Sequence, residues 1–271
     1  IALGKQESDF NCVGVDIDDF DLTDGKALEK CIVDNSIEII VNCAAYTAVN
    51  QAETEPQLAT AINSTAVATM GELVARYGLT WIHISTDYVF DGRSTQAYKP
   101  DDSPNPLNVY GYSKWLGEEA IKKLNPNNTM ILRTSWLYGD NNANFVATLF
   151  EQSAIKKDIE VVADQVGSPT YCDDLAQAIW TMLPQFSSKG HTIYHYANDG
   201  RCSWFEFAQS IVRMSKHDCT ILPKMTTDAT DAIKRPKFSV LDTEKFQKAF
   251  DVSIPHWEAS LKICLNKKIM K

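Results

Sequence analysis

Four short apolar runs, each followed by a segment of helical character, constrain the fold of this chain more than any other feature. The runs occupy residues 10–16, 37–45, 79–86 and 129–136 and read FNCVGVD, IEIIVNCAA, LTWIHIST and TMILRTSW. They are nearly continuous in apolar residues, as strands covered on both faces must be. The helical segments between them span 25–35, 57–77 and 113–124. This repeated order predicts an α/β fold with a doubly wound parallel sheet, whose strands present their carboxyl ends, and hence the ligand site, at one edge.

The pattern loosens after about Tyr138. Residues 159–183 predict a strand, a turn and a helix that opens at Asp173 and Asp174, and residues 191–198 predict another strand. An amphipathic helix is expected to start near Ser203, and two short helices are expected within 239–250 and 254–265. We therefore expect a sheet domain over 1–138 and a smaller C-terminal lobe over 139–271, with about 159–183 returning to the first domain.

The composition excludes several classes of partner and site. The chain carries a net charge of −9 with acidic and basic residues well mixed, which argues against a nucleic-acid or anionic-membrane surface. No run approaches the roughly 18 apolar residues of a membrane span, and no signal peptide is visible. The seven cysteines are scattered and never in CxxC spacing, so neither a disulfide framework nor a zinc site is expected. These features predict a cytoplasmic protein with no membrane, nucleic-acid or metal partner.

The beginning of the chain lacks an expected motif. A dinucleotide-binding sheet normally opens with a strand and a glycine-rich turn that cradles the pyrophosphate at a helix N-terminus. Here the chain begins IALGKQESDF, which is typical of a helix end leading into a second strand. We therefore expect that the first strand and its turn are missing from this chain.

Candidate cofactor contacts follow the first two apolar runs. Asp16 ends its run where such folds contact the adenosine ribose, and a carboxylate there favours NAD over NADP, although a turn aspartate explains it equally well. Asp21 and Leu22 lie in the following loop, where they are candidates for contacting the adenine. Ala44 and Ala45 are small enough to let backbone approach a ligand, but dense packing would also explain them.

The third apolar run and the next helix carry the chemistry. Thr86 falls at the carboxyl end of its strand, where a hydroxyl can donate to a carbonyl oxygen that becomes an alkoxide. Tyr110 and Lys114 are spaced i and i+4 in VYGYSKWLGEEA, so they share one helical face. A neighbouring ammonium is expected to lower the pKa of the phenol and make it a usable general acid. Together the three residues predict a carbonyl reduction site.

These residues and several longer motifs carry a resemblance to a known family. The motifs are VNCAAYTAVNQAETEP, STDYVFDG, PLNVYGYSKWLGE, LRTSWLYG, NFVATLF, DQVGSPTYCDDLA, RPKFSVLDTEKF and PHWEASL. Over nearly its whole length the chain resembles the extended short-chain dehydrogenase/reductases, and among them the dTDP-4-dehydrorhamnose reductases. The resemblance implies a dinucleotide-binding Rossmann-like domain and a substrate-binding lobe. It also implies reduction of the C4 keto group of dTDP-4-dehydro-L-rhamnose by NADH or NADPH, giving dTDP-L-rhamnose for cell-surface polysaccharide.

The resemblance also implies residue roles. Tyr110 would be the proton donor, Lys114 its cofactor-binding partner, and Thr86 the hydroxyl that orients the keto group. Asp87 and Trp136 would contact the dTDP-sugar substrate. The residues that would line the dinucleotide are Asp16, Asp21, Leu22, Ala44, Ala45 and Tyr46, with Tyr110 and Lys114. The assembly is left open, with a homodimer as one option.

Three alternatives stay open. A nucleotide-sugar 4,6-dehydratase would have Asp-Glu after the threonine, whereas Thr86 is followed by Asp87 and Tyr88; a 4-epimerase is disfavoured only by the overall match. A non-catalytic subunit similar to the beta subunit of methionine adenosyltransferase would not need all three of Thr86, Tyr110 and Lys114. A folded domain with an accidental YxxxK is the third alternative.

Three single residues are ambiguous in the sequence. Arg235 either pairs with a substrate phosphate or braces its loop. The sequence favours a helix-surface position for Asn63 over a role in hydrogen-bonding backbone. It favours a core position for His83 within its strand.

Overall fold

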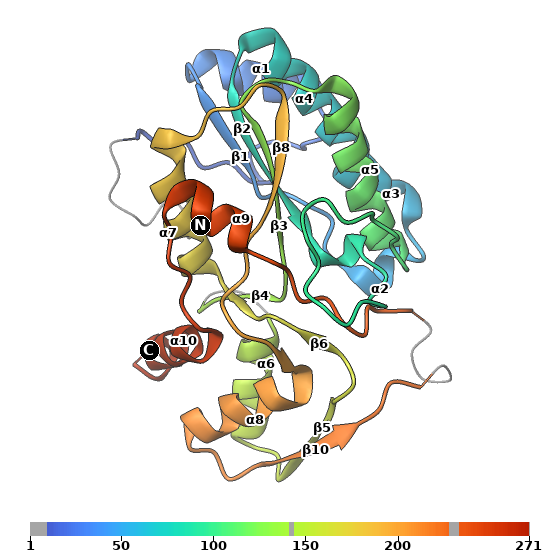
Figure 1. Ribbon diagram of the computed structural model, residues 1–271, viewed down its shortest axis with the longest axis vertical. Coiled ribbons are helices and arrows are strands. Elements are labelled where there is room, and N and C mark those ends of the chain that lie inside the picture. The colour runs from blue at the N-terminus through green and yellow to red at the C-terminus, as the bar shows by residue number, and fades with distance from the viewer. Residues whose placement is uncertain (1–9, 141–143, 228–232, 271) are drawn as a thin grey trace.

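The computed structural model describes residues 10–140, 144–227 and 233–270, arranged as a sheet domain above a smaller lobe (Figure 1). The main sheet has the order β1-β2-β3-β8, with all pairs parallel. Its strands are β1 Ile39–Asn42, β2 Thr80–Thr86, β3 Thr129–Thr134 and β8 His191–His195. The expected doubly wound parallel sheet is thus confirmed, and the carboxyl ends of β1, β2 and β3 meet at one edge.

The expected strand over 10–16 is wrong. The described residues there form no ladder, and 11–16 are exposed. Asp16 instead opens a turn, in which the Asp16 carbonyl accepts from the Asp19 amide at 2.9 Å. A strand exists only where a neighbour completes its hydrogen bonds, and β1 pairs with β2 alone among the described strands. The prediction that the first strand and its glycine-rich turn are missing concerns the start of the chain. Residues 1–9 lie outside the described ranges.

Helices cover both faces of the main sheet. On one face, α1 (Gly25–Asp34), α4 (Ala66–Tyr77) and α5 (Val109–Leu124) pack against side chains such as Trp81 and Ile131. On the other face, α7 (Cys172–Met182) and α9 (Glu244–Phe250) pack against Ile82, Met130 and Leu132. Alternate residues of β2 therefore face opposite helical layers, and His83 faces the layer that contains α5.

Local sequence explains where two of these helices begin. The Asp24 carboxylate caps α1 by accepting from the amides of Lys26 and Ala27. Asn108 caps α5 by accepting from the Gly111 amide at 2.8 Å. The helix expected from Ser113 therefore starts at Val109, and this earlier start places Tyr110 in its first turn.

The single helix expected over 57–77 is three helical segments. After the short helix α2 (Val49–Ala52), the three segments are α3 (Pro56–Thr60), η2 (Ala61–Thr65), which is a turn with π-helical hydrogen bonding, and α4. Such turns insert one residue into a helix and are frequent at functional sites. Two single-turn 3₁₀ segments, η3 (Asp87–Val89) and η4 (Leu183–Gln185), follow β2 and α7.

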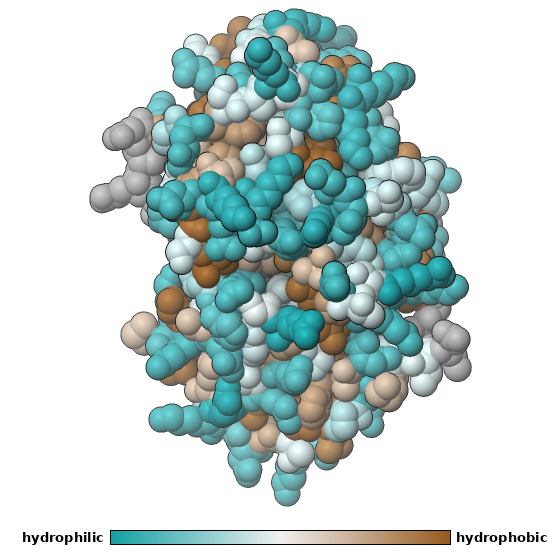
Figure 2. Space-filling view, viewed as in Figure 1, coloured by the Kyte–Doolittle hydropathy of each residue, from teal (hydrophilic) through white to brown (hydrophobic). Residues whose placement is uncertain are grey.

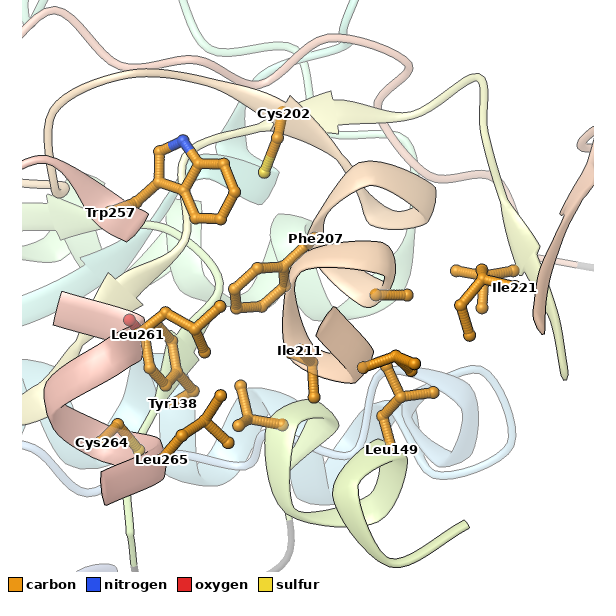
Figure 3. Packing of buried hydrophobic residues seen from close by; sticks show 14 of the residues in the cluster. Tyr138, Leu149, Cys202, Phe207, Ile211, Ile221, Trp257, Leu261, Cys264 and Leu265 are labelled. Carbon is orange, nitrogen blue, oxygen red and sulfur yellow. The ribbon is translucent and has the colours of Figure 1, made fainter. Parts of the chain in front are cut away.

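The lower lobe has its own core, shown in Figure 3. Helices α6 (Phe145–Ser153), α8 (Trp204–Ser215) and α10 (Trp257–Ile269) bury Leu149, Phe207 and Leu261 against one another. Three small two-stranded pairs complete it: β5 (Asp158–Val162) with β10 (Thr220–Lys224), β4 (Leu137–Tyr138) with β7 (Thr170–Tyr171), and β6 (Val166–Gly167) with β9 (Cys202–Ser203). Helix α6 and strand β10 were not anticipated from the sequence.

Within 159–183, β5 pairs in the lobe whereas α7 packs on the main sheet. The domain boundary at 138 stays a prediction. Figure 2 shows hydrophilic residues spread over the visible face of both parts, with smaller apolar areas between them.

Candidate active site

Thr86 is the last residue of β2 and lies buried at the ligand edge of the sheet. Its hydroxyl accepts from the Tyr88 amide at 3.1 Å and donates to Asp87 Oδ1 at 3.2 Å. The first contact caps η3, so the turn that follows the strand fixes the direction of this hydroxyl.

Tyr110 comes to the same place from the first turn of α5. Its side chain hydrogen-bonds Thr86, and its ring meets that of Tyr88 edge-on with centroids 5.6 Å apart. The next residue is Gly111, where a Cβ would lie 2.2 Å from the Tyr88 carbonyl oxygen. Only glycine allows α5 to approach the strand end this closely, so Gly111 is a requirement of the site that the sequence reading missed.

The acid–base state of Tyr110 differs from the expectation. Burial raises its pKa to about 12; the Thr86 hydrogen bond acts to lower the pKa and the Asp87 charge acts to raise it. Lys114 is not among the groups that shift the pKa of Tyr110, because its ammonium is directed elsewhere. At neutral pH the phenol therefore holds its proton.

Lys114 is buried one turn further along α5. Its Nζ donates to the Ile84 carbonyl at 2.7 Å and lies 3.5 Å from His83 Nε2. Burial lowers the pKa of Lys114 to about 8, although the charge of Glu118 acts to raise it. The lysine is thus held at the carboxyl end of β2 with at least one donor position left for a ligand.

Asn63 organises the loop after β1, and the surface interpretation of this residue is wrong. Its amide accepts from the Tyr46 amide at 2.9 Å, donates to the Tyr46 carbonyl at 3.0 Å and donates to Ser113 Oγ at 2.9 Å. The side chain is 1% exposed. Its spacing from buried Ala59 and Val67, four residues to either side, is the sequence signal that could have placed it on the inner face.

The loop after β1 suits the approach of a flat or charged ligand. The Ala44 amide donates to Asn42 Oδ1 at 3.1 Å, and the Tyr46 backbone is held by Asn63. Ala44 and Ala45 are solvent-accessible in part or in full and carry only methyl groups. Small side chains, a fixed backbone and the Lys114 amine are compatible with a bound dinucleotide, and the cofactor roles of these residues stay predictions. Tyr46 itself donates through its hydroxyl to Glu55 at 2.5 Å.

The other candidate cofactor residues lie in the N-terminal loop. Asp16 is exposed and its Oδ1 accepts from the Ile17 amide at 2.8 Å. Asp21 Oδ1 accepts from both the amide and the hydroxyl of Thr23 at 2.8 Å, and Leu22 packs on the core beneath α1. Both carboxylates therefore bond within their own loop, and their cofactor roles stay predictions.

The candidate substrate residues occupy three positions around the strand end. Asp87 follows Thr86 and is 2% exposed; burial raises its pKa to about 7 against hydrogen bonds from Ser239 and Thr86. Arg235 donates to Asn50 Oδ1 at 2.6 Å and hydrogen-bonds the Tyr88 side chain.

Arg235 also lines a shallow pocket with the loop 48–51, so it both braces the loop and faces open space.

Trp136 lies after β3 and reaches toward the lobe. Its backbone has a φ of +49°, and its ring stacks on Trp204 with centroids 3.6 Å apart. A Cβ on Gly167 would lie 2.5 Å from the same ring. The structure thus gathers Thr86, Tyr110 and Asp87 in direct contact, whereas Trp136 belongs to an aromatic stack of the lobe.

The described residues contain neither a metal-binding cluster nor a membrane-spanning helix. Within 10–140, 144–227 and 233–270, no group of three or more His, Cys, Asp or Glu is placed to hold a metal ion. Over the same residues, no helix is long and apolar enough to cross a membrane.

Comparison with known proteins agrees with this geometry. The family profile described as RmlD substrate binding domain matches residues 2–270. The spore coat polysaccharide biosynthesis protein SpsK of Bacillus subtilis is 40% identical over 231 residues, covering 85% of this chain and 80% of the relative. The dTDP-4-dehydrorhamnose reductase of Sinorhizobium fredii is 37% identical over 254 residues, covering 89% of this chain and 84% of the relative.

A solved structure is similar over almost the whole chain. The dTDP-4-dehydrorhamnose reductase of Bacillus anthracis, in complex with NADP, superimposes with a TM-score of 0.92 at 34% identity, covering 98% of this chain and 94% of that one. The chain therefore belongs to the RmlD substrate binding domain family, the family of the dTDP-4-dehydrorhamnose reductases, which are NAD(P)H-dependent oxidoreductases.

Proposed function

We propose that this protein reduces the C4 keto group of dTDP-4-dehydro-L-rhamnose to give dTDP-L-rhamnose, with NADH or NADPH as the reductant. The observation that carries the proposal is the contact between the Thr86 and Tyr110 side chains at the carboxyl end of β2, with Lys114 one turn further along the same helix. A hydroxyl, a phenol and an amine around one position are what reduction of a carbonyl requires.

The nicotinamide, when bound, supplies the hydride. The task of this chain is to receive the negative charge that develops on the carbonyl oxygen. Thr86 orients that oxygen by hydrogen bonding, and Tyr110 delivers the proton to it. Because burial keeps the pKa of Tyr110 at about 12, the phenol is protonated at neutral pH and is a donor in its resting state.

The lysine has a binding role in this proposal. Its Nζ is anchored to the Ile84 carbonyl at 2.7 Å, which fixes its place beneath the helix turn that carries Tyr110. A remaining N–H is available for the hydroxyls of the nicotinamide ribose. Asp87 and Arg235 are proposed to hold the sugar and a phosphate of the substrate, and Trp136 to contact it from the lobe.

The direct test is to mix the purified protein with dTDP-4-dehydro-L-rhamnose and either NADH or NADPH, to follow cofactor oxidation by absorbance, and to identify the sugar product by NMR. We expect turnover to dTDP-L-rhamnose, and the ratio of the two cofactors tests the preference for NAD that Asp16 suggests. Cofactor binding without turnover would instead support a non-catalytic subunit. In a parallel assay with dTDP-glucose, release of water or inversion of the C4 hydroxyl without net cofactor oxidation would indicate a dehydratase or an epimerase.

A further inference from the structure

We propose that His83 is a positioning residue that sets the charge of Lys114, through a directional chain of hydrogen bonds that starts at the Ala44 amide and passes through Asn42. The chain of bonds is a property of the free protein. Its consequence for turnover rests on the proposed function, because only there is Lys114 a cofactor-binding residue.

The first link fixes the orientation of Asn42. The Ala44 amide donates to Asn42 Oδ1 at 3.1 Å, and an amide N–H has no acceptor capacity. The carboxamide oxygen must therefore face Ala44, and its NH₂ group faces His83 Nδ1 at 3.1 Å. Asn42 is 4% exposed, so water does not offer its amide an alternative orientation.

The second link fixes the tautomer of His83. Because Asn42 donates to Nδ1, that ring nitrogen must carry the lone pair, and the single proton of a neutral imidazole must be on Nε2. His83 is fully buried, and this burial lowers its pKa well below the ordinary value. The surroundings therefore stabilise a neutral ring with its proton on Nε2.

The third link reaches the lysine. His83 Nε2 lies 3.5 Å from Lys114 Nζ. An ammonium has no lone pair to accept from the Nε2–H group, whereas an amine has one. The arrangement therefore favours the uncharged form of Lys114, which can still donate to the Ile84 carbonyl.

Other groups around Lys114 act in both directions. Glu118 on the same helix and Cys43 after β1 favour the ammonium, while burial disfavours it. The Glu118 charge is already shared with Arg133 through hydrogen bonds of 2.8 and 2.6 Å. His83 contacts Lys114 directly, and the loop after β1 sets the direction of its hydrogen bonds. His83 therefore links that loop to the charge of the lysine.

The decisive measurement is the tautomer of His83 in the wild-type protein, read from two-bond ¹H–¹⁵N correlations of a sample labelled with ¹⁵N-histidine. We expect the Nε2–H pattern for His83. His195 is an internal control, because its Nδ1 faces the Tyr98 carbonyl at 3.0 Å and its Nε2 lies 3.4 Å from Arg133 Nη1, which requires the opposite tautomer. An Nδ1–H or doubly protonated His83 would overturn the proposal, whether or not the protein turns over the proposed substrate.

Two variants then test the effect on the lysine, whose pKa is read from the ¹³Cε shift of Lys114 during a pH titration. His83→Phe removes the Nε2–H group and is expected to raise the pKa of Lys114 by about one unit. Asn42→Asp keeps an acceptor for Ala44 but places an acceptor before Nδ1, so the ¹⁵N pattern of His83 should switch to Nδ1–H. Because the new carboxylate itself raises a nearby lysine pKa, the lysine midpoint is read from His83→Phe alone.

A purely structural role for His83 would lower the free energy of unfolding of His83→Phe while leaving the Lys114 midpoint in place, and this result would refute the link to the lysine. As a functional readout, the pH midpoint of NADPH binding should move with the lysine pKa. If the tautomer is as expected but neither NADH nor NADPH binds, the proposed function fails and the hydrogen-bond chain stands.

Discussion

At the scale of single residues, burial sets the acid–base behaviour of the site more strongly than neighbouring charge does. The pKa of Tyr110 rises to about 12, that of Asp87 rises to about 7 and that of Lys114 falls to about 8, and desolvation is the first cause of each shift. All three groups are therefore pushed towards their uncharged forms. A site of this kind would present a neutral proton donor, which is what the proposed reduction requires.

Replacement of Tyr110 by phenylalanine tests the proton donor. We expect turnover to fall by about 10²–10⁴-fold, because the phenol is removed while the ring and its edge-on contact with Tyr88 remain. Steady-state kinetics and NADPH titration of both proteins measure this. Tyr112→Phe, at an exposed tyrosine of the same helix, is the matched control. Near-native turnover of the Tyr110 variant would refute the assigned role.

The raised pKa of Asp87 has a consequence for stability. A carboxyl with a pKa of about 7 in the folded protein and an ordinary value near 4 when unfolded keeps its proton longer in the folded state. Its contribution to stability is therefore fully present below about pH 4 and is lost as the pH rises to 7, by at most about 1.4 kcal/mol per pH unit.

The variant Asp87→Asn should remove this dependence. Urea unfolding of both proteins at pH 5 and pH 7 measures it, and the free energy of unfolding of the variant should improve relative to wild type at the higher pH. A difference between the two proteins that does not change with pH would show that Asp87 ionises normally in the folded state.

At the scale of elements, two glycines of α5 decide how closely that helix approaches its neighbours. Gly111 lies against the Tyr88 carbonyl, and Gly117 lies against the π-helical turn η2. Because η2 carries Asn63, which holds the Tyr46 backbone, the fit at Gly117 also supports the loop after β1. Helix packing and site geometry thus depend on the same small residues.

Gly117→Ala tests this fit. The added Cβ would lie 2.2 Å from the Asn63 carbonyl oxygen, so α5 or η2 must shift, and we expect a loss of about 1–3 kcal/mol in the free energy of unfolding together with weaker NADPH binding. Denaturant unfolding and cofactor titration report the two effects. Gly14→Ala is the control, since nothing lies within 4 Å of a Cβ there. Unchanged values for Gly117→Ala would mean that the helix adjusts freely.

At the scale of the whole molecule, one buried ion pair joins the helical layer to the sheet. Arg133 of β3 bonds Glu118 of α5 through two nitrogens, and the two side chains are 1% and 0% exposed. Arg133 also donates to the Pro100 carbonyl at 3.2 Å. Burial alone would raise the pKa of Glu118, but the charge and hydrogen bonds of Arg133 outweigh it and lower the pKa. The pair connects α5, β3 and the loop after η3.

Loss of one partner should be costly to the whole fold. We expect Arg133→Met to lower the free energy of unfolding by about 3–5 kcal/mol, because it leaves the Glu118 carboxylate buried without its partner. The double variant with Glu118→Leu removes both charges and should recover much of the loss. Thermal and urea unfolding of the two variants test this. Equal losses in the single and double variants would locate the damage in packing and not in the unpaired charge.

The features that a single segment determines were predicted correctly. Apolar runs at 79–86 and 129–136 gave β2 and β3, and the YxxxK spacing placed Tyr110 and Lys114 on one helix. The prediction of a strand at 10–16 was wrong because a strand needs a neighbouring strand to complete its hydrogen bonds. A local sequence pattern does not indicate whether such a neighbour exists. The predicted surface position of Asn63 was wrong because the type of a polar side chain does not indicate which backbone groups it will hydrogen-bond.

The sequence by itself determined the alternation of strands and helices around β1, β2 and β3, the side chains available for chemistry and the family, since each depends on residue type and spacing. Only the tertiary structure decided the charges of those side chains and their hydrogen-bond directions. Lys114 turned to the Ile84 carbonyl and His83, and Tyr110 kept a raised pKa, because burial and partners from other elements control ionisation. Electrostatic free energy depends on distances between groups that are far apart in the chain, and folding alone sets those distances.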